Sequence, residues 1–172
     1  MRYSLSLSQN QDRGQSVIKD ENNYPCYILR GNLGGISNTI ILDDIHNQEV
    51  GRLYLDSAHL IATYCIDVIN HSIVKVKKIN SSIANIFFVT RLNYWISGSI
   101  KNGHYSFFSG IKKVASVETL VTDGDFKLLY NIKHPKDVPF ILLVSILFTQ
   151  LHVPPLKLPH LDLSMNYIPI IN

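Results

Sequence analysis

The chain is poor in cysteine and carries no pairing pattern for the cysteines it has. Its 172 residues include only Cys26 and Cys65, and no Cys-x-x-Cys spacing occurs. A disulfide framework and a cysteine-based zinc site are therefore excluded. The first ten residues alternate polar and apolar side chains, so they lack the continuous apolar core of a signal peptide. We expect a cytoplasmic protein with reduced thiols, peripheral to the membrane if it binds lipid.

Charge is also scarce. Charged residues make up 17% of the chain, and 16 Lys and Arg stand against 13 Asp and Glu, a formal net charge of +3. This composition is typical of one globular domain of this length. Strong nucleic-acid binders usually show a higher pI and more arginine, so no nucleic-acid partner is predicted.

No constellation for catalysis or metal binding is present. The seven histidines have no helical ligand spacing and no His-x-His pair. Asp123-Gly124-Asp125 lacks the remaining ligands of a calcium loop, and 31–35 is glycine-rich without the Lys-Ser/Thr of a phosphate loop. A Gly-x-Ser-x-Gly elbow is absent. We therefore predict no enzyme, no cofactor and no metal site.

One hydrophobic run stands out at 138–151. It is too apolar for a surface helix, and it is shorter than the roughly 20 residues that span a bilayer. We predict a buried helix that begins after Asp137 as N-cap and ends before Pro154. The hydroxyls of Ser145 and Thr149 are predicted to bond the carbonyl four residues earlier.

The body from 17 to 130 has the pattern of antiparallel hairpins. Short β-branched or aromatic runs alternate with Asn, Asp and Gly, and the runs at Cys26, Val50 and Val74 are spaced by 24 residues. Asn102-Gly103 predicts a type I′ turn. A repeated hairpin favours a mainly β, closed antiparallel barrel. The lumen of a barrel with ten or more strands needs an apolar filling, which the helix at 138–151 supplies.

We therefore predict a single barrel domain over 1–152 and an extended, Pro-rich apolar tail over 153–172. The tail contains four prolines among many Leu and Ile residues, so it is not expected to be helical throughout. It is expected to lie against the barrel or against a partner.

Short motifs along the chain together resemble the tubby C-terminal-like superfamily, in its bacterial branch near LURP-one-related proteins and scramblases. The matching segments lie at 29–35, 40–44, 49–50, 95–99, 114–117 and 125–128, followed by the apolar helix. This resemblance implies a roughly twelve-stranded antiparallel barrel around a hydrophobic C-terminal helix. It also implies a binding role, because tubby domains bind phosphoinositides and scramblases act at membranes. No binding residue is transferred from the family.

The leading functional hypothesis is a non-catalytic module that binds anionic phospholipid or a membrane surface. It depends on a cationic patch whose members lie on predicted strands: Arg52, Lys75, Lys77, Lys78, Lys112 and Lys113. Each Lys near an anionic surface contributes about 1 kcal/mol. The alternative for these lysines is a solvated strand face that discourages edge pairing. Trp95 is expected to pack in the core or in the barrel wall.

A second hypothesis is an intracellular protein-interaction or structural module that docks through the tail at 153–172. A barrel that holds a small apolar ligand is disfavoured, because the predicted helix occupies the lumen.

Overall fold

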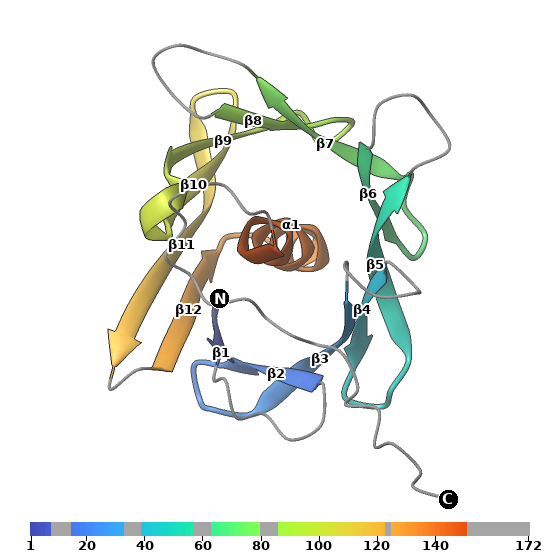
Figure 1. Ribbon diagram of the computed structural model, residues 1–172, viewed down its shortest axis with the longest axis vertical. Helices are drawn as coiled ribbons and strands as arrows, with labels where there is room; N and C mark the ends of the chain where they lie inside the picture. Colours follow the sequence, from blue (N-terminus) through green and yellow to red (C-terminus); the bar gives the residue numbers. More distant parts are fainter. Residues whose placement is uncertain (8–14, 33–38, 57–62, 80–85, 123–124, 151–172) are drawn as a thin grey trace, which may run out of the picture.

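The computed structural model describes residues 1–7, 15–32, 39–56, 63–79, 86–122 and 125–150. It is a closed barrel of twelve antiparallel strands around one helix, seen end-on in the middle of Figure 1. The strands are β1 Arg2–Leu7, β2 Gln15–Asp20, β3 Pro25–Asn32, β4 Thr39–Asp44, β5 Glu49–Asp56, β6 Thr63–Val68, β7 Val74–Ile79, β8 Ile86–Val89, β9 Tyr94–Ser99, β10 His104–Ser109, β11 Lys112–Thr122 and β12 Asp125–Ile132. The 3₁₀ turns are η1 Ile100–Asn102 and η2 Pro135–Asp137, and the helix is α1 Val138–Gln150.

Each strand pairs with its neighbours in sequence, and β1 closes the barrel on β12. The closing ladder runs from Arg2 opposite Asn131 to Leu7 opposite Phe126. Because consecutive strands alternate in direction, the β2–β3, β4–β5, β6–β7, β8–β9 and β10–β11 turns all lie at one end of the barrel. We call this end the turn end. α1 follows β12, so its N-terminus also lies there.

The alternation of side chains along each strand explains which residues of the barrel wall face the core and which face outward. In β5, Leu53 points inward and is fully buried, whereas Arg52 on the same strand is exposed. Ladder pairing places Leu53 beside Ile40 on one side and Ile66 on the other, both fully buried. Such inward rows continue around the barrel and form its core together with the helix.

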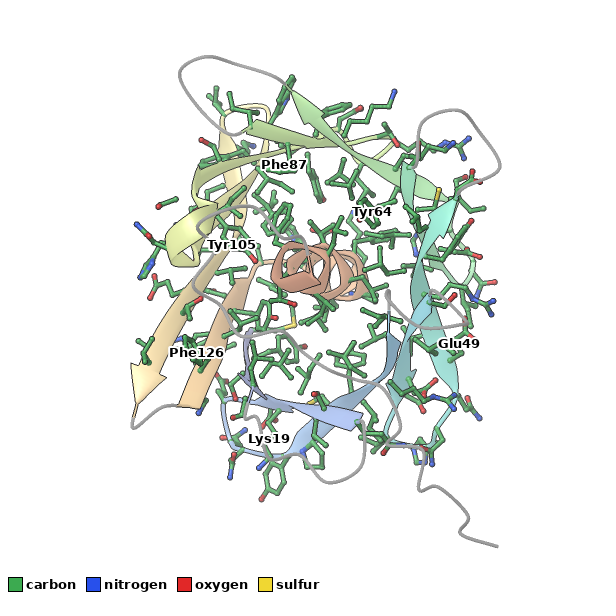
Figure 2. All side chains as sticks on the ribbon, in the orientation of Figure 1. Lys19, Glu49, Tyr64, Phe87, Tyr105 and Phe126 are labelled. Carbon is green, nitrogen blue, oxygen red and sulfur yellow. The ribbon has the colours of Figure 1, made fainter. Side chains whose placement is uncertain are left out.

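The prediction that the apolar helix fills the barrel is confirmed. Residues 138–149 of α1 are buried on every side, which matches a helix that is hydrophobic nearly all round. Phe148 packs against Phe87 and Tyr105, with ring centroids 4.7 Å and 5.3 Å away. Figure 2 shows Phe87 and Tyr105 pointing from the wall towards α1.

The two hydroxyls of the helix behave differently from each other. Ser145 Oγ donates to the carbonyl of Ile141 at 2.7 Å, four residues back, as predicted. Thr149 Oγ1 instead donates to Ile146 at 2.7 Å, three residues back. Both bonds satisfy a buried hydroxyl inside the helix itself.

The predicted strand spacing is confirmed and one predicted turn type is wrong. β3, β5 and β7 begin at Pro25, Glu49 and Val74, close to the 24-residue period. The connection at 100–103 is not a type I′ turn, because only Gly103 takes a positive φ, of 71°. The three-residue turn η1 spans the gap instead, and the Gly103 amide donates to the Ile100 carbonyl. A Cβ at Gly103 would lie 1.9 Å from Thr119 Oγ1, so glycine is required there.

The predicted helix and tail include residues that the structure does not describe. The last residue of the helix prediction, Leu151, and the predicted tail at 153–172 lie outside the described residues. Among the described residues, no helix has the length and apolar character needed to cross a membrane.

Candidate functional site

Strands β7 to β10 and the first part of β11 share a charge pattern that sets them apart. The 50 residues at 68–117 contain no Asp or Glu. They carry seven of the 16 basic residues, leaving nine to balance all 13 acidic ones elsewhere. These seven are Lys75, Lys77, Lys78, Arg91, Lys101, Lys112 and Lys113. Since β7 to β11 are consecutive in the barrel, we call the outer surface of β7 to β10 and of residues 112–117 of β11 the basic wall; β11 continues beyond it to the exposed Glu118.

A row of five side chains crosses the basic wall in register. Lys77 on β7 pairs with Phe88 on β8, and Phe88 pairs with Trp95 on β9. Trp95 pairs in turn with Phe108 on β10, which lies opposite Lys113 on β11. We call this the aromatic–lysine row. Four interstrand steps of about 4.8 Å separate its two lysines, so the row is roughly 19 Å wide.

The row faces outward. Its strand neighbours Val76, Phe87 and Phe107 are buried in the core, so the row residues that alternate with them lie on the outer face. Trp95 is 42% exposed, and its ring lies 4.8 Å from that of Phe88 at an angle of 48°. Trp95 therefore belongs to the barrel wall and not to the core. Adjacent aromatic rings on an outer surface, flanked by lysines, are typical of a binding surface.

The structure separates the six residues of the predicted cationic patch. Lys77 and Lys113 lie at the two ends of the aromatic–lysine row, and Lys112 is exposed beside Lys113. Lys75 is half-buried on β7, and the side chain of Lys78 lies outside the described residues.

Arg52 lies apart, on β5. Its Nε and Nη2 donate to the two carboxylate oxygens of Glu49 at 2.6 Å and 2.9 Å. Its charge is therefore already paired, and Asp67 lies opposite it on β6. The lipid-binding role of all six residues stays a prediction.

Lys75 connects the wall to a basic turn. Its backbone amide donates to Thr90 Oγ1 at 2.8 Å, and the Thr90 amide donates back to the Lys75 carbonyl at 2.9 Å. This pairing places Lys75 beside the β8–β9 turn, which carries the exposed Arg91. On the other side, Lys75 pairs with Cys65, whose thiol pKa is raised by burial although the ammonium of Lys75 opposes this.

Reasoning from sequence missed Phe88, Arg91, Phe108 and Ile111. Ile111 is 98% exposed in the β10–β11 turn, directly before Lys112 and Lys113. One signal in the sequence could have found this region, namely the stretch without acidic residues from 68 to 117.

A pocket of about 390 Å³ at the turn end offers a weaker candidate. It is lined by residues of the β4–β5 and β6–β7 turns and of the segment that leads into α1. Its carboxylates already have partners: Asp44 accepts from the amides of His46 and Gln48, and Glu49 pairs with Arg52. The described residues hold no group of three His, Cys, Asp or Glu that fits a metal ion.

Comparison of the sequence with protein-family models and with curated proteins gives no significant match. Comparison of the structure does give one, to the X-ray structure of an Arabidopsis thaliana protein, AT5G01750. The match has a TM-score of 0.53 at 14% sequence identity and covers 84% of this chain and 89% of that chain. At this identity the likeness concerns the fold alone. The likeness agrees with the closed twelve-stranded barrel around one helix described above.

Proposed function

We propose that this protein is a non-catalytic module that binds the surface of membranes rich in anionic phospholipid. The observation that carries the proposal is the basic wall, with seven cationic residues and no acidic one at 68–117. The aromatic–lysine row on its outer face supports it, because the row combines two exposed lysines with three aromatic rings.

Both components of the row act on the same kind of surface. A Lys or Arg near an anionic leaflet contributes about 1 kcal/mol to binding. Tryptophan is enriched at membrane–water interfaces, where its ring contacts both apolar and polar groups. The acid-free wall also removes the like-charge repulsion that a carboxylate would add against anionic headgroups.

Vesicle co-sedimentation tests the proposal. The probes are phosphatidylcholine vesicles with and without 30% phosphatidylserine, used with the wild-type chain. We expect recovery with the anionic vesicles to exceed recovery with the neutral ones. The double variant Lys77→Glu with Lys113→Glu should bind the anionic vesicles at least roughly tenfold more weakly, since each reversal changes the interaction by more than about 1 kcal/mol.

A matched control separates a located site from net charge. Lys127 and Lys133 are both exposed and lie outside the basic wall, on β12 and just after it. Lys127→Glu with Lys133→Glu changes the net charge by the same amount and should reduce binding much less. Equal recovery of wild type with both vesicle types, or equal losses in the two double variants, would overturn the proposal.

We also propose that the chain belongs to the bacterial branch of the tubby-like superfamily near LURP-one-related proteins and scramblases, and that it acts in the cytoplasm at the inner membrane face. The order of its short motifs, from 29–35 to the helix that follows 125–128, supports the branch assignment. The cationic surface supports the location, because cytoplasmic leaflets carry the anionic lipids.

A further inference from the structure

Resting on the proposed function, we infer that the β10–β11 turn is the element that enters the bilayer. In this arrangement Ile111 reaches below the headgroups, Lys112 and Lys113 remain at headgroup level, and Trp95 lies at the interface. The basic wall thus meets the membrane with its turn end tilted inward.

The β10–β11 turn is built to project an apolar side chain. Ser109 pairs with Lys112, which leaves Gly110 and Ile111 as a two-residue turn. Gly110 has φ 57°, as the first central position of a type II′ turn requires, and an added Cβ there would meet nothing within 4 Å. The ladder fixes the turn from both sides, so Ile111 is held in water with 98% of its surface exposed.

Trp95 lies at the right depth relative to that tip. The preceding residue on β9, Tyr94, pairs with Ser109, the last residue before the turn, and Trp95 pairs with Phe108. At about 3.3 Å per residue, Ile111 reaches roughly 7 to 10 Å beyond the level of Trp95. Apolar faces of interfacial elements enter membranes to about 5 to 10 Å, and Trp side chains prefer the headgroup level above this depth.

Charge distinguishes this turn from the β4–β5 turn at the same end. The β4–β5 turn also presents an isoleucine, Ile45, which is 51% exposed. That turn is flanked by the carboxylates of Asp44 and Glu49, whereas Ile111 is followed by two exposed lysines. An anionic bilayer therefore attracts the β10–β11 turn and repels the β4–β5 turn, although both have apolar tips.

Tryptophan fluorescence tests the inference directly, because Trp95 is the one tryptophan of the 172 residues. On vesicles containing 30% phosphatidylserine, we expect a blue shift of the Trp95 emission. Lipids with a doxyl quencher near the headgroup should quench Trp95 more than lipids with the quencher deep in the acyl chain. Ile111→Ser should weaken vesicle binding at least about tenfold, because burial of an Ile side chain is lost.

Ile45→Ser is the matched control, and it should leave binding within about twofold of wild type. Ile111→Phe keeps an apolar tip and should bind at least as tightly as wild type. Ile111 has no packing role that its loss would disturb, since it is 98% exposed; an unchanged urea unfolding curve for each variant checks that the fold is intact.

The outcomes separate the two proposals. If wild type fails to sediment with anionic vesicles, the proposed function itself is wrong. If wild type binds but Trp95 shows no shift, or Ile111→Ser binds like Ile45→Ser, the basic wall binds the membrane without insertion of this turn, and only the present inference is overturned.

Discussion

The barrel has two sides whose inner faces are both apolar but whose outer faces differ in charge. On β3 to β5, cations lie beside anions: Arg30 pairs with Asp43, and Arg52 pairs with Glu49. We call β3–β5 with these pairs the paired wall, which lies opposite β9–β11 in Figure 1. The basic wall has no Asp or Glu over residues 68–117, and the next acidic residue is Glu118, farther along β11. Paired charges leave little net field at the surface, whereas charges of one sign add up.

The inner faces of both walls are apolar and contact the same helix. Leu42 and Leu53 of the paired wall are fully buried, as is Ile96 of the basic wall. The comparison teaches that apolar packing around α1 is common to both sides of the barrel. The outer positions of each strand are free to differ, because side chains alternate between the two faces.

The largest expected effect comes from the contact between α1 and the inner face of the basic wall. Phe148→Ala removes the ring that contacts Phe87 and Tyr105, and it leaves a cavity at the centre of the barrel. We expect the free energy of unfolding to fall by about 3–5 kcal/mol, measured by urea denaturation. Phe88→Ala on the outer face of the same wall is the control and should cost less than half as much. Similar losses would mean that the two faces are not energetically distinct.

The next effect concerns the paired wall. Asp43 is fully buried and accepts hydrogen bonds from Arg30, with Nη2 at 3.1 Å from Oδ1. Asp43→Ala should lower stability by about 1–3 kcal/mol, because a charge-assisted pair is lost while the half-exposed Arg30 can still reach water. Lys77→Ala on the basic wall should change stability by less than about 0.5 kcal/mol. A larger loss for Lys77→Ala would show that the basic wall also serves stability.

Salt should affect the two walls differently. The Debye length falls from about 10 Å at 0.1 M to about 3 Å at 1 M salt. Binding of the wild-type chain to vesicles with 30% phosphatidylserine should therefore weaken at least roughly tenfold over this range. The urea midpoint should move little, because partly buried pairs such as Arg30 with Asp43 are screened less. Binding that persists at 1 M salt would indicate that aromatic and aliphatic contacts dominate.

The smallest effect is a dependence on alkaline pH at the edge of the paired wall. Burial, and then the neighbouring Tyr3, Cys26 and Asp44, raise the pKa of Tyr27 to about 12. In the unfolded chain Tyr loses its proton near pH 10, so between pH 10 and 12 the folded state binds more protons. Its contribution to stability is complete below pH 10 and is lost as pH rises towards 12.

Tyr27→Phe should reduce the slope of stability against pH in this window, as measured by urea denaturation at several pH values. The other buried tyrosines, Tyr94, Tyr105 and Tyr130, remain in the variant, and their pKa values are raised in the same direction. The difference between variant and wild type therefore isolates Tyr27. Identical slopes of stability against pH in the variant and the wild type would contradict the raised pKa of Tyr27.

Much of the architecture was predictable from local patterns. The run at 138–151 indicated a buried helix, and the hairpins at Cys26, Val50 and Val74 indicated the barrel. β1 and β8 were not identified from the sequence, because β1 alternates polar and apolar residues over only six positions and β8 has only four residues. Both are held by their ladders with neighbours, which sequence patterns do not display. The turn at 100–103 is not the predicted type I′ turn, because the 3₁₀ turn η1 connects β9 to β10.

The candidate site was predictable only in part. Lys77 and Lys113 were found from their charge, but they are separated along the sequence by 36 residues. Their relation to Phe88, Trp95 and Phe108 depends on four separate strand registers and on the shift between Phe107 and Phe108. A shift of one residue in any ladder would turn a row member towards the core. Arg52 looked equivalent in sequence, but its pairing with Glu49 sets it apart.

The sequence by itself determined that one apolar helix must be enclosed and that hairpins must surround it. Both follow from short stretches of chain, because the burial of apolar surface and the turn residues of a hairpin are local properties. It also determined the sign of the charge on residues 68–117. Only the tertiary structure decided which of those charges lie beside aromatic rings and which apolar turn tip projects beside lysines. Register and barrel closure bring together residues that are distant in the chain, and pairing across strands is a property of the whole sheet.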